Sequence, residues 1–468
     1  MQFDSLAYLL LLLGTLVGFY GLGPRGRLGV LLVASVVFYG AWSVELLGLI
    51  AISAAVDFAC GLALGSARVR RRRLVLAASV ITNLGILAYF KYAGFFVRNL
   101  QALLGDAVPG SVLEVVLPPG ISFYTFQTMS YTIDVYRGQL RPTRSVARFF
   151  VYVAFFPQLV AGPIERAARL LPQIEQALRI RFSAANLLVG TRLIVWGMFK
   201  KVVIADHCAR LVEPVYANPE AFDGWAIAVA TYAFTLQIYC DFSAYSEIAR
   251  GSARLLGITL MRNFDQPYLV RNVRDFWRHW HISLSEWFRD YVFVPLGGSR
   301  RGKARTLLNL TATMFLSGLW HGAAWNFVLW GLYHGVLLLV HALWSRRPGA
   351  GWIMARLGGV GRGLAWLCTF HLVVVGWVLF RVDALGDAGV ILERMHGALG
   401  RGGPNGMQAL FLGGVGAFLL LSALARRGRW RERIDASPAA GLLFYGCALL
   451  ATLVLGAQDG PQFIYFQF

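Results

Sequence analysis

The segment 307–342, LLNLTATMFLSGLWHGAAWNFVLWGLYHGVLLLVHA, decides the fold class. It is far longer than the roughly 20 apolar residues that one helix needs to cross the hydrocarbon core of a bilayer. We therefore expect a broken membrane span here instead of a single straight helix. The segment also contains His321, an ionisable residue well inside an apolar stretch.

Apolar stretches of similar character occur along the whole chain. Of its 468 residues, 57% are hydrophobic and only 15% are charged, against about 25% charged residues in soluble proteins. Further spans are predicted at 5–21, 28–46, 47–66, 74–92, 185–205, 225–249, 363–381, 407–425 and 438–457. The short connections predict one all-α, polytopic membrane domain, with N-terminal spans in 1–117, a catalytic core in 118–345 and C-terminal spans in 346–468.

The formal net charge of +20 comes from Lys and Arg residues that lie between the apolar stretches. The densest clusters are Arg68–Arg73 and the five arginines within 426–433. The positive-inside rule assigns such loops to the cytoplasm, and alternating the spans then places both termini on the opposite side. No basic face persists outside these loops, so the pattern does not favour nucleic-acid binding.

The pattern changes in the segment 118–165, where prolines and glycines interrupt the apolar residues. Backbone of this kind is tolerated at membrane depth only where protein buries it or where it lines a water-filled cavity. We therefore expect re-entrant or broken helices around an enclosed path. Ordinary helices kinked at proline are the alternative.

The segment 271–298 interleaves charged and aromatic residues. Its apolar positions recur at steps of three and four, which predicts one face of a helix; they are Trp277, Trp280, Leu284, Trp287 and Tyr291. Because Trp and Tyr favour the headgroup region, we expect this helix to lie at or just below the cytoplasmic interface.

His321 is the most informative of the histidines. It lies fourteen residues after Leu307, which corresponds to about 21 Å of helix and places it within the membrane. An ionisable residue at that depth is a candidate for function, and a neutral imidazole is the form that a general base needs. The alternative is a buried histidine that only bonds a neighbouring carbonyl.

A second histidine, His281, lies on the aromatic segment that precedes this stretch. Two histidines in adjacent membrane elements can converge, one removing a proton from an acceptor while the other positions the donor. His279 points elsewhere on a helix and is interpreted as interfacial, whereas His334 and His341 are interpreted as structural.

Several other polar residues within apolar stretches are candidates for lining a substrate path. Gln237 and Asp241 are four residues apart and share one helical face, where an interhelical hydrogen bond is the favoured alternative. The weaker candidates are Tyr124, Gln127, Gln158 and Trp320.

The chain lacks the usual motifs of other enzyme classes. Its five cysteines are scattered, with no CxxC pair or zinc-ligand spacing, so we predict neither disulfides nor a metal site. The GxGxxG match at 21–26 joins two apolar helices and is interpreted as a loop. No Walker A, HExxH or GxSxG sequence is present.

Longer motifs follow one another in order along the chain: LPPGISFYTFQ at 117–127, FFPQLVAGPI at 155–164, YCDFSAYS at 239–246, RDFW at 274–277, WHISLS at 280–285 and GLWHG at 318–322. Together they resemble the bacterial alginate O-acetyltransferase branch of the membrane-bound O-acyltransferases. Two small departures from that pattern are Ala244, where glycine is usual, and Glu247, where aspartate is common.

The resemblance implies a helical domain of the bacterial inner membrane with a central funnel that leads to a catalytic histidine. It places that histidine on His321 and matches His281 to the second signature histidine. It also implies acetyl-CoA as donor substrate with no bound cofactor, a periplasmic partner of the SGNH acetyltransferase or esterase-like type, and an exported polysaccharide as final acceptor.

Two other functions remain as alternatives. One is a membrane transporter or acyl-group conduit whose histidines relay protons, although no matching interrupted segments appear in two halves of the chain. The other is a lipid-acyl transferase of the same fold.

Overall fold

The computed structural model describes residues 1–66, 71–105, 116–345, 347, 350–400, 402–457 and 459–464, with no side-chain description for 350–355 and 399. Within these ranges the regular structure is helical and contains no strand. The predicted Arg68–Arg73 cluster is described only from Arg71 onward. The chain forms two compact units, which are treated separately below.

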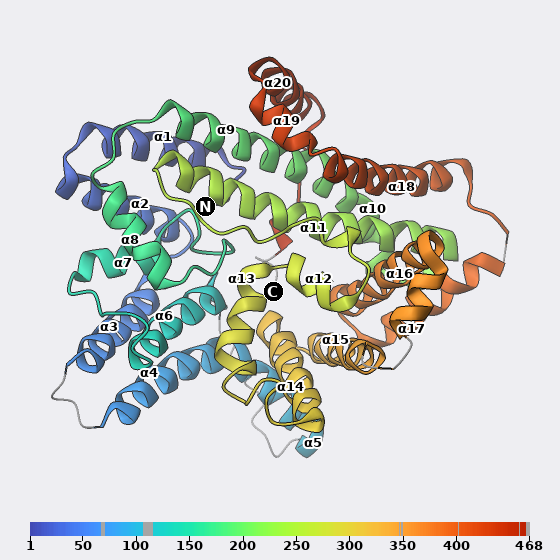
Figure 1. Cartoon of the computed structure of the whole chain (residues 1–468), viewed down its shortest axis with the longest axis horizontal. Helices are drawn as coiled ribbons and strands as arrows, with labels where there is room; N and C mark the ends of the chain where they lie inside the picture. The colour runs from blue at the N-terminus through green and yellow to red at the C-terminus, as the bar shows by residue number, and fades with distance from the viewer. Residues whose placement is uncertain are drawn as a thin grey trace. The chain divides into compact units, whose positions relative to one another are not determined.

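The first unit comprises Met1–Gly197 together with Tyr245–Arg262. Its helices are α1 (Leu6–Gly21), α2 (Pro24–Gly40), α3 (Leu47–Leu64), α4 (Arg72–Leu87), a π-helical turn (Ala88–Tyr92), α5 (Ala93–Leu104), α6 (Ile121–Tyr136), α7 (Val146–Ala154), α8 (Ala167–Ala177) and α9 (Ala184–Met198). Helices α3, α4 and α6 pack against one another, and α7 packs against α2 and α3 (Figure 1).

The second unit comprises Met198–Ala244 and Asn263–Ile464. Its helices include α10 (Asp206–Ala217), most of α11 (Gly224–Leu255), α12 (Val273–His279), α13 (Ile282–Phe288), α14 (Lys303–His321), α15 (Trp325–Trp344), α16 (Ala350–Arg381), α17 (Leu385–Gly397), α18 (Gly406–Arg427), α19 (Trp430–Ala436) and α20 (Pro438–Leu455). Helices α14 and α15 pack along each other (Figure 1). Two π-helical turns, Phe199–Ala205 and Arg289–Phe293, follow α9 and α13.

The predicted spans agree with the helices to within a few residues at most boundaries. Six helical segments of the described chain are long and apolar enough to cross a membrane, which makes this a multi-pass membrane protein. They are Leu47–Leu64, Arg72–Leu104, Trp325–Trp344, Arg356–Arg381, Gly406–Arg427 and Pro438–Leu455. The span predicted at 74–92 is longer than expected, because its helix continues through a π-helical turn into α5.

The segment 118–165 is broken, as its prolines and glycines predict, and it is largely buried apart from the connection 137–148. Fourteen of the sixteen residues of α6 are buried, and the residues that follow α7 run without a helix as far as α8. Gly120 makes this packing possible: its φ is +72°, and a Cβ there would lie 2.8 Å from the Leu159 carbonyl oxygen. Buried irregular backbone of this kind fits the expectation for a membrane interior.

The single helix predicted across 277–291 is wrong. The chain breaks between α12 and α13, where His281 takes a left-handed conformation with φ +41°. The break is stabilised by Asn263, whose carbonyl accepts from Ile282 N at 2.9 Å and whose side chain accepts from Ser283 N at 3.2 Å. Trp280 and Trp287 are buried by protein, and the predicted placement of this segment at the interface stays a prediction.

Candidate functional site

His321 is the last residue of α14 and lies where the apolar segment 307–342 breaks. The following Gly322 is extended, with φ −164° and ψ 156°, and α15 begins at Trp325. A Cβ at Gly322 would come within 2.1 Å of the Phe327 ring, so glycine is required for this close turn. The predicted break therefore occurs immediately after the histidine.

The crossing of α14 and α15 fixes the direction of His321. A Cβ at Gly318 would lie 2.2 Å from the Phe327 carbonyl oxygen, and one at Gly331 would lie 2.5 Å from the Met314 carbonyl oxygen. Small residues at these positions let the two backbones touch, as at many helix contacts in membranes. One turn after Gly318, the histidine is held by two rigid elements.

Aromatic rings enclose the His321 imidazole. The ring centroid of Trp330 lies 4.9 Å away and that of Phe380 lies 5.2 Å away, both in edge-on geometry. Trp320 contacts the imidazole at 5.0 Å. The side chain is buried but retains 5% exposure, whereas His281 and His334 have none.

His281 lies against the same tryptophan. Its ring centroid is 5.8 Å from that of Trp320 and 4.7 Å from that of Phe242 on α11. Burial lowers the pKa of His281 to about 3, so its imidazole is neutral at physiological pH. The structure thus brings the two predicted histidines to one indole ring, in neutral and apolar surroundings.

His334 on α15 is a third buried histidine in this cluster. Its ring contacts Trp330 at 4.9 Å and Trp277 at 5.0 Å. Among the described residues, neither of its ring nitrogens has a hydrogen-bond partner. We define the histidine cluster as His281, His321 and His334 with the rings of Trp277, Trp320, Trp330 and Phe380.

The interhelical contact that Asp241 makes is an ion pair. Its carboxylate lies 3.0 Å from Lys201 Nζ and accepts a hydrogen bond from Ile464 N at 2.8 Å. Lys201 also pairs with Asp206 at 2.8 Å and donates to the Pro461 carbonyl at 2.7 Å. This lysine cluster, defined as Lys201, Asp206 and Asp241, holds the segment 461–464 against α11.

Sequence reasoning missed Lys201, although a signal was present. Lys200 and Lys201 lie within the predicted span 185–205, and buried lysines require a partner. Gln237, one turn before Asp241, is 8% exposed, and its Oε1 has no hydrogen-bond partner within the described chain. Gln237 and Asp241 lie on one helix, α11, as predicted.

The remaining candidates belong to the first unit. Gln127 Nε2 donates to the Tyr152 carbonyl at 2.5 Å, and Gln158 Nε2 approaches the same oxygen at 3.3 Å. Tyr124 is fully buried, and its hydroxyl has no hydrogen-bond partner among the described residues. Gln127 therefore joins α6 to α7, and Gln158 joins the stretch after α7 to the same carbonyl. The predicted role of both glutamines in lining a substrate path stays a prediction.

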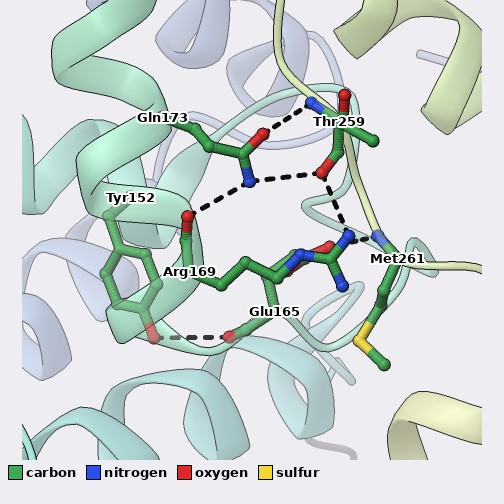
Figure 2. A network of polar contacts seen from close by, with 6 residues as sticks. All are labelled: Tyr152, Glu165, Arg169, Gln173, Thr259 and Met261. Atoms are coloured by element: carbon green, nitrogen blue, oxygen red, sulfur yellow. Dashed lines mark hydrogen bonds and ion pairs between the residues drawn. The ribbon is translucent and has the colours of Figure 1, made fainter.

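The buried carboxylate of Glu165, in the first unit, was also missed. It accepts a hydrogen bond from Met261 N and lies 3.8 Å from Arg169 Nε, in a network that also holds Gln173 and Thr259 (Figure 2). Burial raises the pKa of Glu165 to about 7, although nearby arginines oppose the shift. This network fixes the segment after α11 onto α8.

Comparison with known proteins identifies the class of enzyme. The model of the MBOAT, membrane-bound O-acyltransferase family matches residues 112–378. The chain is 38% identical to a probable alginate O-acetylase of Pseudomonas putida over the full length of both proteins. It is 40% identical to a probable alginate O-acetylase of Azotobacter vinelandii, over 85% of this chain and 78% of the relative.

A third relative carries a different name. The chain is 32% identical to a peptidoglycan O-acetyltransferase of Helicobacter pylori, over 79% of this chain and 74% of the relative. The matched family region contains His281, His321 and His334. With the apolar helices and the buried histidines, these similarities make the chain a multi-pass acyltransferase. It belongs to the membrane-bound O-acyltransferase family, in its alginate O-acetylase branch.

Proposed function

We propose that this protein transfers an acetyl group from cytoplasmic acetyl-CoA, across the inner membrane, for O-acetylation of an exported polysaccharide such as alginate. The observation that carries the proposal is the enclosure of His321, which ends α14 among aromatic rings and shares Trp320 with His281. The names of the relatives favour an acetyl group and a polysaccharide acceptor.

In the proposed reaction, His321 acts as general base. Its neutral imidazole takes the proton of an acceptor hydroxyl while the hydroxyl oxygen attacks the thioester carbonyl. The carbon–sulfur bond breaks, and the leaving thiolate takes the proton back from the imidazolium. The products are an acetyl ester and free CoA, and His281 positions the donor.

The acceptor of this step is proposed to be a periplasmic partner of the SGNH type, which passes the acetyl group to the polysaccharide. The positive-inside rule supports transfer from the cytoplasm to the periplasm, because it assigns the basic loops to the cytoplasm and both termini to the periplasm. A reporter fused to either terminus tests that topology. Alkaline phosphatase activity is expected from both fusions, and its absence would contradict the proposed topology.

His321→Ala should abolish acetylation of the exported polymer while leaving expression and membrane insertion intact. General acid–base residues contribute about 10²–10⁴-fold to rate. Acetyl esters on the polymer are measured in a deletion strain that carries the variant gene. His207→Ala is the matched control, because His207 is exposed on α10, and unchanged acetylation in His321→Ala would refute the proposed role.

Purified protein with radiolabelled acetyl-CoA separates an enzyme from a conduit. The proposed function predicts release of CoA together with transfer of label to an added acceptor or to water. A transporter or conduit would do neither. Label that stays entirely in acetyl-CoA in the presence of folded protein would therefore favour the alternative function.

A further inference from the structure

A cavity of about 970 Å³ lies in the second unit, away from the rings that enclose His321. It is bounded by the segment 269–272 with α12, by the first part of α16 and by the end of α18. Its chemistry is mixed, because arginines line it together with leucine, valine and tryptophan. No residue given a catalytic role above lines it.

Four arginines give the cavity its charge: Arg271, Arg362, Arg426 and Arg427. Their guanidinium groups make no hydrogen bond or ion pair with the described residues. The one carboxylate in the wall, Asp275, accepts from Asn272 at 2.7 Å and lies 3.4 Å from Arg278, so its charge is already balanced. The wall therefore carries an uncompensated positive charge that complements phosphate.

The apolar part of the wall continues onto the outer surface of a membrane helix. Leu419 on α18 is buried in the cavity wall, whereas the adjacent Leu420 also lines the cavity and is 61% exposed. Gly363 and Gly416 also line it, and a Cβ at either would meet no atom within 4 Å. The cavity thus has room beside its arginines for a hydrocarbon chain.

The arginines lie at the ends of two membrane-spanning segments. Arg426 and Arg427 end the span Gly406–Arg427, and Arg362 lies less than two turns into the span Arg356–Arg381. Because these helix ends meet at one cavity, both lie at the same membrane face, where lipid headgroups are found. A ligand here can place phosphate among the arginines and acyl chains along α18.

We propose that this cavity binds the headgroup of an anionic phospholipid of the phosphatidylglycerol class. Basic pockets between membrane helices recognise such headgroups, and each basic side chain near an anionic surface contributes about a fivefold change in affinity. A soluble phosphate ester would satisfy the arginines but not the exposed apolar wall. The site is independent of the proposed acetyl transfer.

Native mass spectrometry of the full-length protein, released from nanodiscs that contain phosphatidylglycerol and phosphatidylcholine, tests the site. We expect selective retention of phosphatidylglycerol, roughly thirtyfold weaker in Arg426→Gln/Arg427→Gln. Arg429→Gln/Arg433→Gln removes the same charge from the same basic region outside the cavity and should retain the lipid. Equal retention of both lipids, or equal loss in both variants, would overturn the proposal.

Two further measurements identify the source of the phosphate. Gly416→Phe keeps every arginine and fills the open space, so it should also weaken phosphatidylglycerol binding while the protein stays monodisperse. Free CoA and inorganic phosphate are added to lipid-depleted protein as competitors. One outcome is that CoA or phosphate binds the original protein but not Arg426→Gln/Arg427→Gln, while phosphatidylglycerol binds neither protein. In that case the cavity is a soluble-phosphate site and the lipid assignment fails.

Discussion

The second unit buries polar groups in two different ways. In the lysine cluster, Lys201 is fully buried between the carboxylates of Asp206 and Asp241, at 2.8 and 3.0 Å. In the histidine cluster, imidazoles lie among indole and phenyl rings, with centroids about 5 Å apart. One region pairs opposite charges, and the other surrounds imidazoles with apolar rings.

The difference indicates what each region does. Paired buried charges fix the packing of elements, since breaking such a pair leaves an uncompensated charge inside the protein. An imidazole in an apolar enclosure is suited to accepting a proton from a substrate, because a general base works best where it is positioned and shielded from bulk water. We therefore assign stability to the lysine cluster and chemistry to the histidine cluster, and the following predictions test that division.

The largest loss of stability is expected from Lys201→Met. It leaves Asp206 and Asp241 buried beside each other without a cation, which typically costs about 3–5 kcal/mol. Thermal unfolding of the purified protein in detergent measures the change. Lys303→Met, at an exposed lysine that begins α14, is the control, and equal melting temperatures for the two variants would contradict the structural role.

A smaller loss is expected from Gly318→Ala. Its new Cβ would meet the Phe327 carbonyl, so α14 and α15 must separate, at a cost of roughly 1–3 kcal/mol. Because His321 lies one turn further along α14, acetyl transfer should fall as well. Gly14→Ala on α1, where a Cβ meets no atom within 4 Å, should change neither quantity, and full activity in Gly318→Ala would show that the crossing does not position the histidine.

Glu165 offers an intermediate case, a buried carboxylate that lies 3.8 Å from Arg169 Nε. Its pKa rises from 4.5 to about 7 on folding, so between these values the folded protein holds a proton that the unfolded chain has lost. Stability should therefore decrease with rising pH in that range, by at most about 1.4 kcal/mol per pH unit. Glu165→Gln should flatten this part of the pH profile, and an unchanged slope would argue against the protonated carboxyl.

The smallest effect is expected from His334→Phe. Its nitrogens make no hydrogen bond with the described residues, and a ring of similar volume should cost less than about 1.5 kcal/mol. Acetyl transfer should stay within a few-fold of the original rate. A hundredfold loss would extend the catalytic role to this histidine.

Most of the helical framework could be predicted from the sequence, because hydropathy and length determine which segments can cross a membrane. The break of the segment 307–342 was predicted for the same reason. The break at His281 could not be, because Asn263 supplies its two hydrogen bonds from a segment eighteen residues upstream. Local periodicity contains no information about such a partner.

The candidate site was predicted in part. His321 could be found because an ionisable residue is rare inside an apolar segment. Its enclosure could not, since Trp330 and Phe380 lie on other helices. Lys201 and Glu165 were missed because partners of each come from distant parts of the chain, Asp241 and Pro461 in one case and Met261 in the other.

The assignment of the chemistry to His321 within the histidine cluster is tested most directly by one rate comparison. Acetyl transfer from labelled acetyl-CoA is measured for purified His321→Ala and His334→Phe at equal amounts of folded protein. We expect a rate at least about 100-fold lower for His321→Ala and a nearly unchanged rate for His334→Phe. Equal rates in the two variants would contradict the assignment of chemistry to His321.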